Sequence, residues 1–294
     1  MPKISAVICC YNAAHTIEAA CRSVGWADEL VVVDSGSTDQ TPQIARMYAR
    51  EFVTEPWRGY TEQKRFGTSL CRNEWVLVLD ADEECSPELA GEISRLSPKE
   101  LEEKDVFLIR RRNYQMGRYV RAWSPDWQSR LIHRERCRWA EEPLHDSRLP
   151  SNPTRAAKLE GWIDHNRYSQ AGFADYFNGK LADARLRLIA EHLFRRGKRC
   201  GWMDLLVRPT LAFVKLYFLK LGFLDGQFGL LIAQKAAIAA QLKYAALWAM
   251  QMGYLKSGDD PTIRGYAGVD LESAGPPAGE LRDTKRPLPR SPLA

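Results

Sequence analysis

The order of the apolar runs in the first 80 residues constrains the fold of this chain more than any other feature. Four short runs rich in Val, Ile and Leu, at residues 4–10, 30–33, 52–53 and 75–79, alternate with stretches that have apolar residues at helical spacing. Strands that alternate with helices pair in parallel, and apolar runs without polar alternation are covered on both faces. We therefore expect an α/β domain with a mostly parallel central sheet flanked by helices.

Beyond residue 85 the pattern is less regular. Residues 86–104 resemble one helix, residues 106–109 a fifth strand, and residues 113–165 irregular loops and short strands. This first domain would span residues 1–165, and an amphipathic helical region would follow at residues 166–256. The last segment, 257–294, contains 6 Pro, 5 Gly and few large apolar residues, so we expect a disordered tail.

Basic residues concentrate in the helical region. Residues 180–256 contain 13 Lys and Arg against 4 Asp and Glu, whereas the remainder contains 29 against 33. Basic, aromatic and aliphatic residues on the same helices are typical of contact with an anionic membrane surface, although a helical lid is the alternative. The sequence shows neither a signal peptide nor an apolar run of the ~20 residues that a span requires. We expect a cytoplasmic protein that is peripheral on the inner face of the membrane. We expect no binding to nucleic acid, because the sequence contains no recognised nucleic-acid-binding motif.

Carboxylates follow two of the apolar runs directly. Asp80 and Asp82 follow the fourth run, and Asp34 closes the second. Open parallel sheets bind ligands at the carboxyl ends of their strands, so we expect these three side chains to gather at one edge. Crowded carboxylates are stabilised by a cation, and hard oxygen ligands suit Mg²⁺ or Mn²⁺ together with the phosphates of a nucleotide. The pattern therefore predicts a metal and nucleotide site.

Other interpretations of the acidic pair fit the sequence less well. An EF-hand loop requires Gly at its sixth position and Glu at its twelfth, but Cys85 and Gly91 occupy those positions. A phosphatase with an Asp nucleophile normally has a small hydroxyl residue where this chain has Glu84. Acidic residues that only cap the next helix are the simplest alternative, and Asp34 at the same edge argues against it.

Several motifs together resemble the family 2 glycosyltransferases of the GT-A fold. Within that family the chain resembles the lipopolysaccharide inner-core β-1,4-glucosyltransferases over about residues 3–250. The matching stretches are residues 31–39, 79–83, Gly59-Tyr60-x-x-Gln63-Lys64, Arg111-Arg112-Asn113, Pro125-Asp126-x-Gln128-x-Arg130-Leu131, Leu144-His145 and 218–226.

The resemblance implies roles for residues on the donor side of the site. Tyr11 and Asp34 would contact the nucleoside, which we expect to be uridine, and Asp80 would reach the ribose or the metal. Gln63 and Lys64 would lie near the donor, where the Lys64 ammonium would neutralise phosphate charge. The implied donor is a UDP-sugar.

The resemblance also implies the metal ligands and the catalytic base. Asp82 would ligate Mg²⁺ or Mn²⁺ directly, with Asp80 and His145 as further candidates. Asp126 would be the general base that deprotonates the acceptor hydroxyl, with Glu142 as the next candidate. Three tryptophans that flank this region would line the acceptor cleft or pack in the core: Trp123, Trp127 and Trp139.

The activity implied by the resemblance is an inverting single displacement. A hexose, glucose from UDP-glucose in the first instance, would move to a lipopolysaccharide core or a related lipid-linked glycan. Two alternatives remain open at this point. One is a nucleotide-sugar or lipid-binding protein without catalysis, and the other is the Asp-nucleophile phosphatase.

Overall fold

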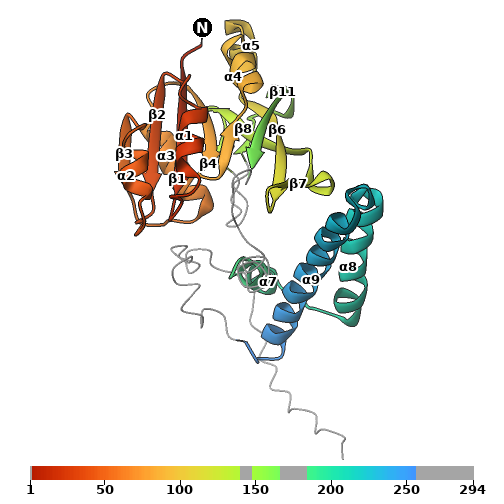
Figure 1. Ribbon diagram of the computed structural model, residues 1–294. Coiled ribbons are helices and arrows are strands. Elements are labelled where there is room, and N and C mark those ends of the chain that lie inside the picture. Colours follow the sequence, from red (N-terminus) through yellow and green to blue (C-terminus); the bar gives the residue numbers. More distant parts are fainter. Residues whose placement is uncertain (1, 140–147, 166–183, 256–294) are drawn as a thin grey trace, which may run out of the picture.

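The computed structural model describes residues 2–139, 148–165 and 184–255 (Figure 1). Residues 4–80 contain β1 (Ile4–Cys10), α1 (Ile17–Ser23), β2 (Glu29–Asp34), α2 (Thr41–Ala45), β3 (Glu51–Thr54), α3 (Tyr60–Leu70) and β4 (Trp75–Asp80). There follow β5 (Glu83–Cys85), α4 (Pro87–Ser94), α5 (Pro98–Glu103), β6 (Val106–Gln115), β7 (Arg118–Tyr119), η1 (Arg121–Trp123), β8 (Asp126–His133), β9 (Arg138–Trp139), β10 (Arg148–Leu149), η2 (Pro153–Arg155) and β11 (Ala156–His165). The last part contains α7 (Ala184–Arg195), α8 (Trp202–Val214), the π-helical turn η3 (Lys215–Leu219), η4 (Gly222–Asp225) and α9 (Gly226–Gln251).

Most strands of the described part join one nine-stranded mixed sheet. Its order is β3-β2-β1-β4-β8-β6-β11-β5, with β7 paired to β6 outside this row. The pairs among β3, β2, β1 and β4 are parallel, as predicted from the first 80 residues. β8 is inserted antiparallel between β4 and β6, whereas β11 runs parallel to β6 and antiparallel to β5. The α/β class is confirmed, with an antiparallel strand in the middle of the sheet.

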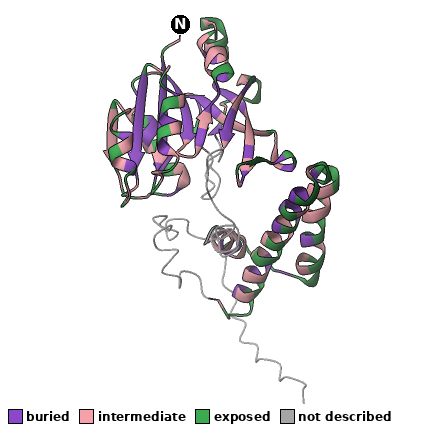
Figure 2. Ribbon diagram, viewed as in Figure 1, coloured by how far each residue is buried: buried purple, intermediate pink, exposed green. Residues whose placement is uncertain are grey.

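Within the parallel half, β1, β2 and β4 are buried on both faces, whereas the edge strand β3 is partly exposed (Figure 2). Successive residues of β1 point to opposite sides, so Ile8 packs in the cluster that contains Ile17 of α1, and Val7 packs in the cluster that contains Phe66 of α3. Helices α1 and α3 therefore cover opposite faces of the sheet. This two-sided burial explains why the apolar runs lack polar alternation.

The segment 86–104 forms two helices, not the single helix that we predicted. Ser97 starts the second one with a capping box: its hydroxyl accepts from the Glu100 backbone N–H, and the Glu100 carboxylate accepts from the Ser97 N–H. A residue before proline is disfavoured in helical conformation, and Ser97, which precedes Pro98, has an extended ψ of 153°. The Ser97-Pro98 pair thus separates α4 from α5.

The prediction of irregular loops and short strands for residues 113–165 is wrong for β8 and β11, which span 8 and 10 residues. Charged residues inside β11 interrupt its apolar pattern and hide it from periodicity. Asp164 is one of them, and its carboxylate accepts two hydrogen bonds from the Arg112 guanidinium of β6, at 2.6 and 2.8 Å. A bidentate ion pair of this kind allows a carboxylate to be buried within the sheet.

The C-terminal region is helical, as predicted, and α9 attaches it to the sheet (Figure 1). Phe228 and Ile232 of α9 pack against Val120, next to β7. Lys235 of α9 donates a hydrogen bond to the Gln115 side chain at 3.0 Å. The later part of α9 packs against α7 and α8. The predicted division of the chain at residues 165 and 256 stays a prediction, and the predicted tail at 257–294 lies outside the described residues.

Gly161 lies where β11 passes close to α4. A Cβ atom at this position would be 2.4 Å from the Leu89 Cα, and a side-chain rotation cannot relieve a contact with backbone. We expect Gly161→Ala to lower the free energy of unfolding by about 1–3 kcal/mol, measured by urea denaturation. Gly201→Ala is the control, because no atom lies within 4 Å of its added Cβ. Equal effects of the two substitutions would contradict the prediction.

Candidate active site

The carboxyl ends of β2, β1 and β4 meet at one edge of the sheet. In the parallel register Cys10 of β1 lies opposite Asp34 of β2, and Cys9 lies opposite Asp80 of β4. Asp82 follows in the turn between β4 and β5. The three acidic residues therefore reach the same edge, as the strand order required.

Asp34 is buried and bound within its own turn. Its Oδ2 accepts from the backbone N–H groups of Gly36 and Ser37 at 3.1 and 2.9 Å, and its Oδ1 accepts from the Ser37 hydroxyl at 2.5 Å. Gly36 has a φ of 87°, a conformation that favours glycine. Asp34 thus shapes the loop after β2. The nucleoside contact that we predicted for it would use its remaining acceptor capacity.

The other predicted donor residues have different surroundings. Tyr11 directly follows β1, and its side chain is exposed. Gln63 is buried, and its amide bridges two segments: it accepts from the Arg58 N–H at 3.1 Å and donates to the Glu55 carbonyl at 3.1 Å and the Ser35 hydroxyl at 3.2 Å. The Gln63 side chain therefore links the segment 55–58, which follows β3, to Ser35 in the turn after β2.

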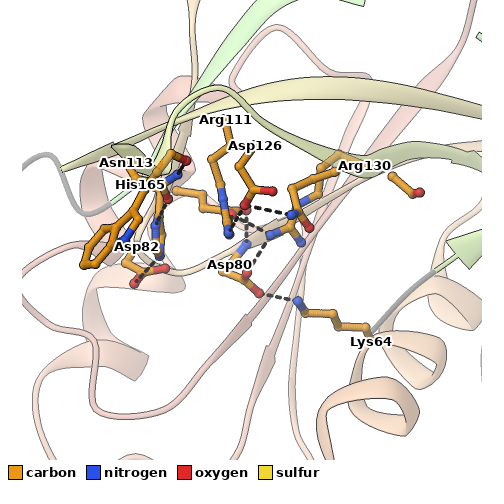
Figure 3. Close-up of polar contacts among 12 residues, drawn as sticks. Lys64, Asp80, Asp82, Arg111, Asn113, Asp126, Arg130 and His165 are labelled. Carbon is orange, nitrogen blue, oxygen red and sulfur yellow. Dashed lines mark hydrogen bonds and ion pairs between the residues drawn. The ribbon is translucent and has the colours of Figure 1, made fainter. Parts of the chain in front are cut away.

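Acidic and basic side chains alternate in a continuous network behind this edge (Figure 3). The carboxylate of Asp80 pairs with Lys64 and, at 2.7 Å, with Arg130. Arg130 also binds Glu83 at 2.5 Å, and Glu83 binds Arg111 at 3.0 Å. Three of these residues, Lys64, Arg130 and Glu83, are buried, so their charges are stabilised mainly by their partners of opposite charge in the network.

The network fixes the charge of Asp80. Burial by itself raises the pKa of a carboxyl group, but the attraction of Arg130 and Lys64 outweighs it and holds the pKa of Asp80 well below its usual range. Lys64 is therefore occupied with Asp80 in this structure. We predicted that Lys64 neutralises phosphate, and that role would require it to be shared between Asp80 and the donor.

The network ends at Asp126, the predicted base. Arg111 of β6 lies opposite Asp126 of β8 in the antiparallel register, and its Nη2 donates to Asp126 Oδ2 at 2.7 Å. Gln128 donates to the same oxygen at 2.9 Å. The side chain of Asp126 is 38% exposed, so an incoming hydroxyl can reach the carboxylate.

Sequence reasoning missed His165. Its Nε2 lies 3.4 Å from Asp82 Oδ2, and its Nδ1 lies 2.9 Å from the Asn113 side-chain oxygen (Figure 3). Burial raises the pKa of Asp82, but the hydrogen bond and charge of His165 outweigh it and lower the pKa. β11 pairs with β6 so that His165 lies opposite Asn113. The missed signal is a histidine at the carboxyl end of a strand, which was hidden because β11 was not predicted.

The described residues test the predicted metal ligands. No group of three or more His, Cys, Asp and Glu among them is arranged to hold a metal ion. Asp34 and Asp80 are engaged by the contacts described above, and the predicted ligation by Asp82, Asp80 and His145 stays a prediction. The remaining pair, Asp82 with His165, fits a cation that takes few protein ligands and completes its shell with phosphates and water. His145 and the alternative base Glu142 lie outside the described residues.

The three tryptophans make contacts within the protein. Lys158 lies over the Trp127 ring at 4.6 Å, Arg148 over Trp139 at 5.0 Å, and Lys235 over Trp123 at 5.7 Å. These cation–π contacts fit the packing alternative. An acceptor contact by any of the three stays a prediction.

Comparisons with known proteins agree with this architecture. The family model described as glycosyl transferase family 2 matches residues 5–156. An uncharacterized glycosyltransferase of Rickettsia bellii is 30% identical over 83% of this chain and 86% of its own length. The lipopolysaccharide core biosynthesis glycosyltransferase LpsC of Rhizobium meliloti is 28% identical over 84% of this chain and 93% of its own length. Among solved structures, S. aureus TarS in complex with UDP-GlcNAc is 16% identical, with a TM-score of 0.42, over 85% of this chain and 92% of that chain.

The matched segment begins in β1 and ends at the start of β11, so it contains the parallel strands and the antiparallel strand that carries Asp126. It thus includes the network and every site residue predicted from the sequence, whereas His165 lies beyond it. The chain belongs to the family 2 glycosyltransferases, and its mixed sheet with C-terminal helices is the GT-A fold that the sequence resemblance implied.

Proposed function

We propose that this glycosyltransferase is inverting and moves a hexose, glucose from UDP-glucose, onto a lipopolysaccharide core or a related lipid-linked glycan. The observation that carries the proposal is the joining of Asp82 with His165 at the edge where the ion-pair network leads from Asp80 to Asp126. The similarity to LpsC over most of both chains supports the class of acceptor. The choice of glucose rests on the resemblance described above.

Asp82 and His165 would hold the divalent cation, Mg²⁺ or Mn²⁺. When bound, such a cation stabilises the negative charge that develops on a departing diphosphate. Asn113 orients the imidazole through Nδ1, which leaves Nε2 on the side of Asp82. Tyr11, which is exposed at the same edge, would contact the nucleoside.

Asp126 would accept the proton of the acceptor hydroxyl as that oxygen attacks the anomeric carbon. Arg111 and Gln128 both bind Oδ2, so they orient the carboxylate and leave Oδ1 for the hydroxyl as far as the described residues show. Attack from the face opposite the nucleotide inverts the anomeric configuration in one step. A nucleophilic Ser or Cys is not required.

We further propose that the chain works in the cytoplasm, attached peripherally to the inner face of the membrane. A lipid-linked acceptor would be presented there. The excess of basic residues at 180–256 supports attraction to an anionic leaflet.

A thermal-shift screen of UDP-, GDP- and ADP-sugars, with and without Mn²⁺, tests the donor. A ligand that binds the native state alone raises the melting temperature, and we expect the largest rise for UDP-glucose with Mn²⁺. Release of UDP in the absence of acceptor would separate a transferase from a protein that only binds the nucleotide sugar. Trapping of a phosphoryl group on Asp80 would instead favour the phosphatase.

His165→Ala should lower the affinity for Mn²⁺, so that donor binding requires a higher Mn²⁺ concentration. Loss of a metal ligand or of a group that supports one lowers metal affinity by about tenfold or more, so the Mn²⁺ concentration at half-maximal thermal shift should rise accordingly. His192→Ala, on α7, is the control. An unchanged Mn²⁺ titration of His165→Ala would remove His165 from the metal site.

A further inference from the structure

Exposed apolar side chains gather where α8 turns into α9. Residues 211–224, which we call the apolar tip, carry six large apolar side chains that are each at least 43% exposed: Leu211, Phe218, Leu219, Leu221, Phe223 and Leu224. Isolated exposed apolar residues are ordinary on protein surfaces, but a contiguous group marks an interaction site.

The charges of the tip favour a lipid surface as its occupant. Residues 205–224 contain no Asp or Glu, and the tip carries the exposed Lys215 and Lys220. Asp225, immediately after the tip, is paired with Arg121 at 3.5 Å. Apolar side chains with lysines beside them are suited to the boundary between acyl chains and anionic headgroups.

The length and composition of the helices agree with this occupant. No single described helix is long and apolar enough to cross a membrane, but Trp202–Leu219 and Gly222–Gln251 reach that hydrophobicity together, and a bend of 71° separates them. A pair bent in this way can enter one leaflet and return. The apolar tip is the bend itself.

The backbone of the tip packs closely on the start of α9. An added Cβ at Gly229 would lie 1.8 Å from the Gly222 carbonyl oxygen, so the start of α9 and η4 are in close backbone contact. This contact joins the backbone that carries Phe223 and Leu224 to α9.

The tip also contacts the catalytic domain close in sequence to Asp126, the proposed general base. The Arg121 N–H of η1 donates to Asp225 at 3.2 Å, and the chain continues from η1 directly into β8, which begins at Asp126. Insertion of the tip would therefore bring the start of β8 to the membrane surface, where the headgroup of a lipid-linked acceptor lies.

We propose that the apolar tip inserts into one leaflet of a phospholipid bilayer and holds the acceptor side of the active site against it. The proposal deepens the membrane attachment proposed above and rests on it. It differs in one measurable respect: attachment by insertion persists when salt screens the basic residues, whereas attachment by charge alone does not.

Sedimentation with vesicles of phosphatidylethanolamine and phosphatidylglycerol tests the proposal. At about 1 M NaCl, where the Debye length is about 3 Å, the full-length protein should stay bound. The double variant Phe218→Ser, Leu219→Ser should bind at least about tenfold more weakly, because two apolar side chains no longer insert. Met47→Ser, at an equally exposed apolar position that follows α2, should bind like the wild type.

A second measurement does not depend on the strength of binding. An environment-sensitive fluorophore on Leu219→Cys should shift to shorter wavelength with vesicles, and the same label on Met47→Cys should not. Most described cysteines are buried, so the label is selective for the new thiol.

Three outcomes would overturn the proposal: release of the wild type by salt, wild-type binding by the double variant, or no shift at Leu219→Cys. Concentration-dependent self-association that the double variant abolishes would do so as well, because the tip would then join two copies of the chain. Release of UDP from UDP-glucose in solution is measured separately and should be equal in the variant and the wild type. Loss of that activity in both would count against the proposed function and leave insertion standing.

Discussion

Asp126→Asn is expected to lower the turnover number for sugar transfer by about 10²–10⁴-fold, the contribution typical of a general base. The amide keeps nearly the same shape and can still accept from Arg111 and Gln128, but it cannot take the proton of the acceptor hydroxyl. Donor binding should be preserved, because the residues proposed to bind the nucleotide and the metal lie on other strands or beyond their ends. The measurements are the steady-state turnover number and the thermal shift with UDP-glucose and Mn²⁺.

Glu160→Gln is a matched control for Asp126→Asn. Glu160 is also a carboxylate paired with an arginine of β6, Arg110 at 3.1 Å, but its side chain is 74% exposed and it lies away from the network. Its turnover should equal that of the wild type. A loss of less than tenfold in Asp126→Asn would mean that another residue is the base, and Glu142 would be tested next.

The parallel half of the fold could be predicted because its strands are visible in their own sequence. β1, β2 and β4 are short, uninterrupted apolar runs that are buried in the sheet. The carboxyl ends of parallel strands lie at one edge of a sheet, so the sequence was sufficient to predict that Asp34 and Asp80 lie at the same edge.

The antiparallel half could not be predicted in the same way, because charged residues inside its strands are stabilised by partners elsewhere in the chain. Arg112 and Asp164 are 52 positions apart, and each is a charged residue inside a strand that is stabilised by the other. A periodicity that counts apolar residues therefore misses β11. Because β11 was not predicted, its last residue, His165, was not recognised as a neighbour of Asp82.

The partners of individual site residues were also beyond sequence reasoning. Asp80 was expected to crowd Asp82 and Asp34 around a cation. Instead Lys64 and Arg130 neutralise it, one from α3 and one from β8. Which basic side chain reaches a given carboxylate depends on strand order, and β8 lies beside β4 only because the chain returns antiparallel after β6.

Glu83 lies at the centre of the ion-pair network, and its loss should strongly destabilise the fold. Its side chain is fully buried, and one of its oxygens accepts from both Arg111 and Arg130 while the other accepts from the Asp80 backbone N–H at 3.1 Å. Glu83→Gln keeps the shape and removes one negative charge from between two guanidinium groups. Two carboxylates, Asp80 and Asp126, would then remain for three buried or half-buried cations.

We expect Glu83→Gln to lower the free energy of unfolding by about 3–5 kcal/mol, because removal of one partner leaves buried charge uncompensated. Glu160→Gln should change it by less than about 1 kcal/mol, since an exposed ion pair contributes little. Urea denaturation of the two variants measures the difference. If the two stabilities are equal, the network is not balanced by buried charge, and the low pKa of Asp80 requires another cause. If they differ as expected, Glu83 is the residue that allows two arginines to lie beneath the substrate edge, where they hold Asp80 ionised and Asp126 in position.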